Sequence, residues 1–173
     1  MFLELIATFI AGIAGAGVLM LLNRALGKRL PRWMIPVAAG AAMLVSTISS
    51  EYSWYSRTSG SLPEGIEVAE TVESKVMYRP WTYAKPFVER FVAVDVATAR
   101  RNPDQPGIVL VDLLFFGRWQ PLRKLAVMFD CQNNRQTLVP EEVNFDADGA
   151  LIGAQWGAIS PDEPTFELAC GGA

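Results

Sequence analysis

The chain has 173 residues, of which 51% are hydrophobic, and a formal net charge of −3. It contains no histidine, which excludes Ser–His–Asp and Cys–His catalytic sites, His-ligated zinc or iron, and a proximal haem ligand. Residues 51–173 carry eleven basic and seventeen acidic side chains, and this net charge of −6 argues against a nucleic-acid partner.

Residues 2–22 form the first of two long apolar segments. As a helix rising about 1.5 Å per residue, this segment spans a hydrocarbon core roughly 30 Å thick. A cleaved signal peptide is the alternative, because the run AGIAGAG offers small residues to a signal peptidase. Such peptides begin with a basic region, whereas the N-terminus here carries Glu4 and no basic residue. We therefore expect a transmembrane helix over about 2–22.

Residues 33–52 form the second apolar segment, which is less hydrophobic than the first. Trp33 marks its near end, and Tyr52, Trp54 and Tyr55 lie at its far end. Tryptophan and tyrosine gather at membrane interfaces in this way. The pattern predicts a second transmembrane helix over about 33–52, and a two-helix membrane anchor over 1–55.

The loop between these segments, residues 23–32, is strongly basic. It carries Arg24, Lys28, Arg29 and Arg32 and no acidic residue. So short a loop makes the two helices antiparallel, and Lys and Arg in short loops stay on the cytoplasmic side. We expect a cytoplasmic loop and periplasmic N- and C-termini at a bacterial inner membrane. The alternative, a soluble helical hairpin with a solvated basic turn, would leave large apolar patches exposed.

Small residues four apart occur in both segments, where they form shallow grooves for close helix packing. The grooves either join the two helices to each other or receive helices of another subunit, and the sequence leaves both alternatives open. The residues concerned are Ala11, Gly12, Gly15, Ala16, Ala38, Ala42 and Ser46.

After a polar linker over 56–65, residues 66–173 read as short strands joined by tight turns. Alternating patterns cover 88–99 and 122–131, and an apolar run at 108–116 predicts a central strand covered on both faces. The segment 66–76 fits a strand or a short helix. The C-terminal residues PDEPTFELACGG predict a short helix that ends before Gly171. The predicted fold is a transmembrane helical hairpin followed by a small, mainly antiparallel β (α+β) extracytoplasmic domain.

Both cysteines, Cys131 and Cys170, lie in this second domain. On the oxidising side of a membrane they predict a disulfide. It would close a loop of about forty residues and stabilise the domain by roughly 4 kcal/mol in the chain-entropy treatment. The alternative is two unrelated buried thiols.

Two further motifs have competing interpretations. Asn144, Asp146 and Asp148 follow the spacing of a calcium loop, but Gln155 stands where that loop needs a glutamate, and an Asp-Gly hairpin turn explains the same residues. In YRPWTY, residues 78–83, proline predicts an extended segment. Its aromatic residues and arginine are typical of binding hot spots, with packing onto the domain core or the membrane surface as the alternative. The candidate partner-binding residues are Tyr78, Arg79, Trp81 and Tyr83.

Asp112 interrupts the apolar strand at 108–116. A buried carboxylate needs a partner, and Arg90 and Arg118 are the candidates. A structural ion pair explains this aspartate better than a catalytic role.

These features together favour a non-catalytic protein without cofactor or metal. We expect an accessory or assembly subunit that contacts the lipid bilayer and other membrane protein subunits. Its helical hairpin would dock on a larger complex, and its β domain would cover the periplasmic face. The alternative is a membrane-tethered periplasmic module that binds a ligand or senses the envelope.

Overall fold

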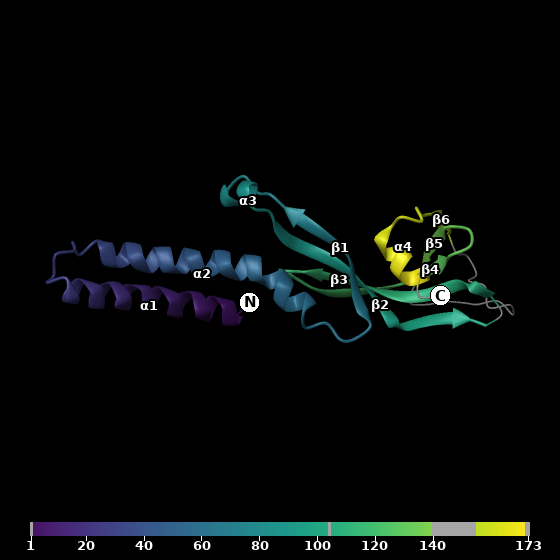
Figure 1. Ribbon diagram of the computed structural model, residues 1–173, viewed down its shortest axis with the longest axis horizontal. Helices are drawn as coiled ribbons and strands as arrows, with labels where there is room; N and C mark the ends of the chain where they lie inside the picture. The colour runs from purple at the N-terminus through teal and green to yellow at the C-terminus, as the bar shows by residue number, and fades with distance from the viewer. Residues whose placement is uncertain (1, 104, 140–154, 172–173) are drawn as a thin grey trace. The chain divides into compact units, whose positions relative to one another are not determined.

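The computed structural model describes residues 2–103, 105–139 and 155–171, and the chain divides into two compact units, Met1–Arg57 and Thr58–Ala173. The first unit holds two long helices, α1 (Phe2–Ala25) and α2 (Met34–Ser59) (Figure 1). Both are long and apolar enough to cross a membrane. The second unit is a curled antiparallel sheet with a short C-terminal helix, so the predicted order of elements is confirmed.

Helix α2 runs seven residues beyond the predicted end at residue 52, so residues 56–59 of the predicted linker are helical. The polar residues there bond to the helix backbone: Ser53 Oγ donates to the Ser49 carbonyl (2.8 Å), and Arg57 Nε donates to the Ser53 carbonyl (3.3 Å). These side chains find hydrogen-bond acceptors on the preceding turn, so they are accommodated within a continuous helix. The helix stops just before Gly60.

The connection between α1 and α2 is a compact turn built around Asn23. The Lys28 N–H donates to the Asn23 carbonyl (2.7 Å), and the Leu30 N–H donates to Asn23 Oδ1 (2.9 Å). Gly27 and Lys28 have φ angles of 73° and 61°, a left-handed conformation that reverses the chain after a helix. The turn leaves Arg24, Lys28, Arg29 and Arg32 exposed.

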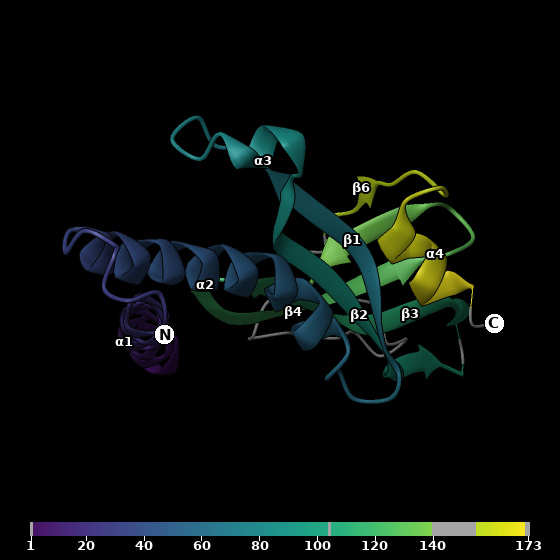
Figure 2. The same cartoon turned by 60° about the vertical axis from the view of Figure 1, so that its left-hand side comes forward.

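Six strands form one sheet in sequence order, and each pairs antiparallel with the next. The undecided segment 66–76 is mostly strand. The strands are β1 (Ile66–Ser74), β2 (Phe87–Asn102), β3 (Gln105–Gly117), β4 (Gln120–Asp130), β5 (Arg135–Leu138) and β6 (Gly157–Ala158). Figure 2 shows β1, β2 and β3 curling across the unit.

The main core lies between the sheet and the C-terminal helix α4 (Pro164–Cys170). Phe166 of α4 meets Phe129 of β4 edge-on, with ring centroids 5.9 Å apart. Val111 and Leu114 are buried on opposite faces of β3, in line with the predicted central strand. The buried side chains of this core are Val94, Val109, Val111, Leu113, Val127, Phe129, Phe166 and Ala169.

A bulge in β2 fixes where the chain enters the sheet. Between Asp95 and Arg100 the pairing with β3 shifts, and the Val96 and Ala97 N–H groups turn to the carbonyl of Gly65 (2.8 and 3.2 Å). Gly65 has a φ of 89°, and a Cβ there would collide with the Ala97 side chain. Glycine is therefore required at the start of β1.

Candidate interaction surfaces

The two long helices pack on each other through their glycines. A Cβ at Gly15 would lie 2.6 Å from Ala42 Cβ and 3.0 Å from the Ala38 carbonyl oxygen, and one at Gly12 would strike Met43. The grooves predicted from the small-residue spacing thus join α1 to α2 at these positions. Gly17 of α1 and Gly40 of α2 differ, because a Cβ at either would meet nothing within 4 Å.

The remaining apolar surface of the helical hairpin is exposed. Phe2, Leu3 and Ile13 expose 75%, 78% and 73% of their surface, and Leu44 and Val45 on α2 expose more than half. Gly12 is the buried residue of α1 and Glu51 that of α2. Exposed apolar faces on this scale belong against lipid or other apolar protein.

The polar and aromatic residues lie at the two ends of the hairpin. At the turn end, Trp33 is exposed beside the basic turn. At the open end, Ser50 Oγ donates to Glu4 Oε1 (3.2 Å), linking α2 to α1. Tyr52, Trp54 and Tyr55 are half-buried on the last turns of α2, where the sequence predicts an aromatic belt.

Cys131 and Cys170 form the predicted disulfide, with Cα atoms 5.8 Å apart. It joins the residue after β4 to the last residue of α4. The bond therefore fastens α4 over the core that it covers.

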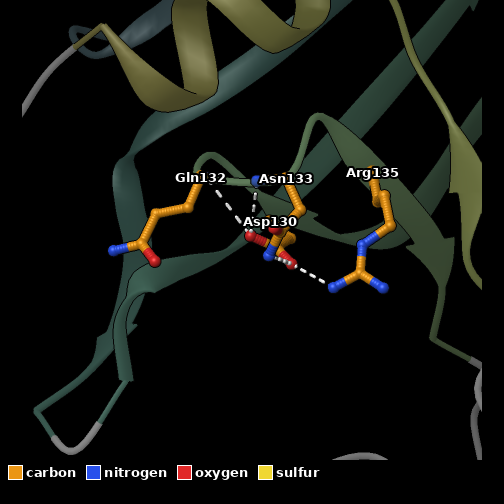
Figure 3. Close-up of polar contacts among 4 residues, drawn as sticks. All are labelled: Asp130, Gln132, Asn133 and Arg135. Atoms are coloured by element: carbon orange, nitrogen blue, oxygen red, sulfur yellow. Dashed lines mark hydrogen bonds and ion pairs between the residues drawn. The ribbon is translucent and has the colours of Figure 1, made fainter.

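Asp130, next to this disulfide, organises the turn between β4 and β5 (Figure 3). Its Oδ1 accepts hydrogen bonds from the Gln132 and Asn133 N–H groups (3.2 and 3.1 Å). Its Oδ2 accepts from Asn133 Nδ2 (2.8 Å) and pairs with the Arg135 guanidinium (2.6 Å). The side chain of Asp130 is buried, with these partners around its carboxylate.

The charged form of Asp130 is favoured by these contacts. Burial by itself raises the pKa of a carboxyl group. The hydrogen bonds from Asn133 and Arg135 and the nearby positive charge outweigh burial, and they hold the pKa of Asp130 below its ordinary value of 3.8. The carboxylate thus acts as a structural clamp for the turn.

The candidate partner-binding residues lie in the long connection between β1 and β2. Proline predicts an extended segment there, but Trp81–Ala84 form one helical turn, α3. This prediction was wrong because Pro80 occupies the N-cap, where its fixed φ of −60° suits a helix start. Tyr78 (73%) and Tyr83 (59%) are well exposed, whereas Trp81 (37%) is partly covered and Arg79 is half-buried.

A groove of about 430 Å³ opens on the sheet near the turn between β3 and β4. Its lining is mainly apolar and includes two arginine side chains. The residues that line it include Val72, Arg90, Val92, Phe115, Arg123 and Leu125. This is the concave, partly polar surface that a small amphipathic ligand needs.

Asp112 pairs with a residue that the sequence does not single out. Its Oδ2 lies 2.8 Å from Lys124 Nζ, on the neighbouring strand β4. The predicted partners were Arg90 and Arg118. Ala126 of β4 lies directly opposite Asp112, so Lys124, two residues earlier on β4, lies diagonally next to it. This register explains why Lys124 forms the ion pair.

The calcium candidates Asn144, Asp146 and Asp148 lie outside the described residues. Within residues 2–103, 105–139 and 155–171, no group of three or more His, Cys, Asp or Glu side chains is placed to hold a metal ion.

Sequence reasoning missed the exposed residues around the turn between β3 and β4. Trp119 exposes 49% and Leu122 56% of its surface, and the Arg118 guanidinium lies 4.8 Å from the Trp119 ring centre. The available signal was a tryptophan beside an arginine inside a predicted turn, GRWQP, where turn residues are usually small or polar.

Comparison with models of protein families, with curated proteins and with solved structures found no significant match.

Proposed function

We propose that the chain is a non-catalytic accessory or assembly subunit of a bacterial inner-membrane complex, anchored by α1 and α2. The basic turn faces the cytoplasm, and both termini and the sheet unit lie in the periplasm. The hairpin docks on the helices of the complex, and the sheet unit covers the periplasmic face of that complex.

The observation that carries this proposal is the bare apolar surface of α1 and α2. The helices use Gly12, Gly15, Ala38 and Ala42 to pack on each other, and most of the large apolar side chains elsewhere on them are exposed. Water is a poor solvent for such faces. Lipid tails and the helices of a partner would cover these apolar faces.

Two independent features support the orientation. Arg24, Lys28, Arg29 and Arg32 mark the turn as the cytoplasmic side. The disulfide of the sheet unit indicates an oxidising compartment for the rest of the chain. Since an antiparallel hairpin separates its turn from the residues beyond α2, the two features agree on one topology.

Gly17 and Gly40 support docking on another subunit. They are glycines that the hairpin does not use, because each faces open space. A glycine in a membrane helix lets another backbone approach closely. These two positions are therefore where we expect partner helices to touch.

Comigration on native gels after mild detergent extraction tests the docking. The wild-type chain should run with a large complex, and pull-down with mass spectrometry should identify its members. Gly40→Leu should weaken comigration, whereas Ala41→Leu, at an exposed neighbouring position, should not. A wild-type chain that runs as a monodisperse monomer would refute the subunit role.

Labelling with an impermeant maleimide in intact cells tests the topology. Ser59→Cys, at the end of α2, should react from outside, and Ala25→Cys, at the end of α1, should not. The opposite pattern would reverse the orientation.

The groove on the sheet favours a second candidate, a membrane-tethered module that binds a small amphipathic ligand. Arg90 and Arg123 in its lining would hold an anionic group, and Val92 and Phe115 an apolar chain. A monodisperse monomer that retains such a molecule in native mass spectrometry, and loses it in Arg123→Ala, would support this role over the subunit role.

A further inference from the structure

Strand register brings two separate turns to one end of the sheet. Arg90 of β2 pairs with Gly117, the last residue of β3, and Ser74 pairs with Phe87 where the chain leaves β1 for α3. The connection that contains α3 and the turn between β3 and β4 therefore lie at the same end (Figure 1). We define this basic end as residues 72–91 and 115–124.

The basic end opposes the charge of the rest of the domain. It carries seven basic and two acidic side chains, a net charge of +5. Residues 51–173 as a whole have a net charge of −6, so the remainder carries −11. Lys124 is neutralised by Asp112, and the other six cations outnumber the carboxylates of Glu73 and Glu89.

Exposed apolar and aromatic side chains lie among these cations. Met77 exposes 86% of its surface, Tyr78 73% and Tyr83 59%, and Trp119 and Leu122 add to the surface from the second turn. Arg79 lies over the Tyr78 ring at 5.2 Å, much as Arg118 lies over Trp119. Aromatic rings beside lysine and arginine are the composition of protein surfaces at the headgroup level of a bilayer.

This surface is held in place by buried contacts. Thr82 of α3 is fully buried; its Oγ1 accepts from the Val76 N–H (3.0 Å) and donates to the Arg79 carbonyl (2.7 Å). At the second turn, the Arg118 N–H donates to the Glu89 carbonyl of β2 (3.2 Å). The apolar side chains are thus displayed by a fixed scaffold.

We propose that the basic end lies against anionic phospholipid headgroups of the membrane that α1 and α2 cross, with Met77, Tyr78, Tyr83 and Trp119 entering the interface. This proposal rests on the proposed membrane anchoring. Lipid suits the surface because cations and exposed aromatic side chains are interleaved over two turns at one end of the sheet, and a positively charged surface of this kind attracts anionic headgroups.

The tether keeps the basic end within reach of the bilayer. The six residues 60–65 between α2 and β1 extend at most about 20 Å. From there, the nine residues of β1 span about 30 Å and end at the basic end. The strand is long enough to bring α3 back to the headgroups.

Spin labelling of the full chain in lipid nanodiscs tests the contact. A nitroxide on Met77→Cys should be far more accessible to oxygen than to a water-soluble nickel complex when the disc contains phosphatidylglycerol. A nitroxide on Thr98→Cys, an exposed control in the β2 bulge, should show the aqueous pattern. A Met77 label that is as accessible to nickel as the Thr98 label would overturn the proposal.

Charge reversal tests the electrostatic part. Lys75→Glu with Lys85→Glu should lower the oxygen-to-nickel accessibility ratio at residue 77 severalfold, and so should discs of phosphatidylcholine alone. Arg100→Glu with Arg101→Glu, exposed and outside the basic end, is the matched control and should leave the ratio unchanged. Equal effects of the two double variants would contradict binding through the basic end.

The outcomes separate this proposal from the membrane anchoring itself. If the chain does not stay with the disc, the anchoring is wrong. If it stays while the Met77 label remains aqueous, the lipid contact alone fails. An aqueous Met77 label, together with loss of native-gel comigration in Lys75→Glu with Lys85→Glu, would assign the basic end to a protein partner and overturn the lipid contact.

Discussion

The helical unit and the sheet unit bury their apolar side chains in different ways. Phe129 of β4 is fully buried in a core that the sheet and α4 make for themselves. Phe9 of α1 exposes 58% of its surface, in a hairpin whose helices approach closely at Gly12 and Gly15. The sheet unit therefore supplies its own stability, whereas the hairpin depends on what surrounds it.

The same substitution in the two units gives the sharpest contrast. Phe129→Ala should lower the free energy of unfolding of the sheet unit by about 3–5 kcal/mol, because it leaves a cavity next to Phe166. Phe9→Ala should change it by less than about 0.5 kcal/mol. Denaturant unfolding of the full chain in detergent, followed by circular dichroism in the strand region, measures both. Similar losses in the two variants would contradict the independence of the units.

The disulfide should stabilise the sheet unit and leave the hairpin unchanged. Cys131 and Cys170 are 39 residues apart, and in the chain-entropy treatment such a bridge contributes roughly 4 kcal/mol. Adding a reductant should therefore lower the unfolding midpoint of the sheet unit and leave the helical signal intact. Cys131→Ala with Cys170→Ala is the control, since its midpoint should be low already and insensitive to reductant. An unchanged midpoint in the reduced wild type would show that the core alone holds α4.

The contrast also explains which parts of the fold can be predicted from sequence. The apolar helices and the basic turn are local signals that one segment of the sequence reveals, and the cysteine pair follows from composition, since the chain has two cysteines. The end of α2 was wrongly predicted because residues 56–59 are polar and resemble a linker, whereas the helix continues to Ser59. Pro80 predicts an extended backbone at the residue before it, whereas in the structure Pro80 is the N-cap residue of α3.

Features that depend on strand register escape the sequence. The pairing of Asp112 with Lys124 follows from the alignment of β3 and β4, and the pattern alone suggests arginines instead. The basic end joins Lys75 to Arg118 and Arg123, which are more than forty residues away in the chain. The net charge of the domain is negative, so the sequence alone does not indicate a positively charged surface. The basic end is recognised only when the strand register shows that the two turns lie at the same end of the sheet.

Glycine contacts in the hairpin offer a smaller effect that separates internal packing from external docking. Gly15→Val should force α1 and α2 apart at a cost of about 1–3 kcal/mol, because its side chain would overlap Ala42 and the Ala38 carbonyl. Gly17→Val should leave the hairpin closed, since nothing lies within 4 Å of its Cβ position. Distances between nitroxides on Leu3→Cys and Ser49→Cys, measured by pulsed electron paramagnetic resonance in detergent, should lengthen or broaden with Gly15→Val alone. Identical distance distributions in the two variants would show that the contact at Gly15 does not hold the hairpin.

The smallest expected effect concerns Asp130 and acid. Its pKa in the folded protein lies below the ordinary value of 3.8, because hydrogen bonds from Asn133 and Arg135 outweigh burial. Its contribution is therefore fully present above an unfolded-state pKa of about 3.8 and is lost as the pH falls through the folded-state value. At neutral pH, Asp130→Asn should destabilise the sheet unit by on the order of 1 kcal/mol, and the deficit relative to wild type should shrink below about pH 3.8. Urea unfolding at a series of pH values measures this difference, and Asp162→Asn, at an exposed aspartate, is the control that should follow the wild type. A deficit that stays constant through the acid range would mean that the turn depends on the shape of this side chain and not on its charge, which would remove the carboxylate from the forces that hold β4, β5 and the adjacent disulfide together.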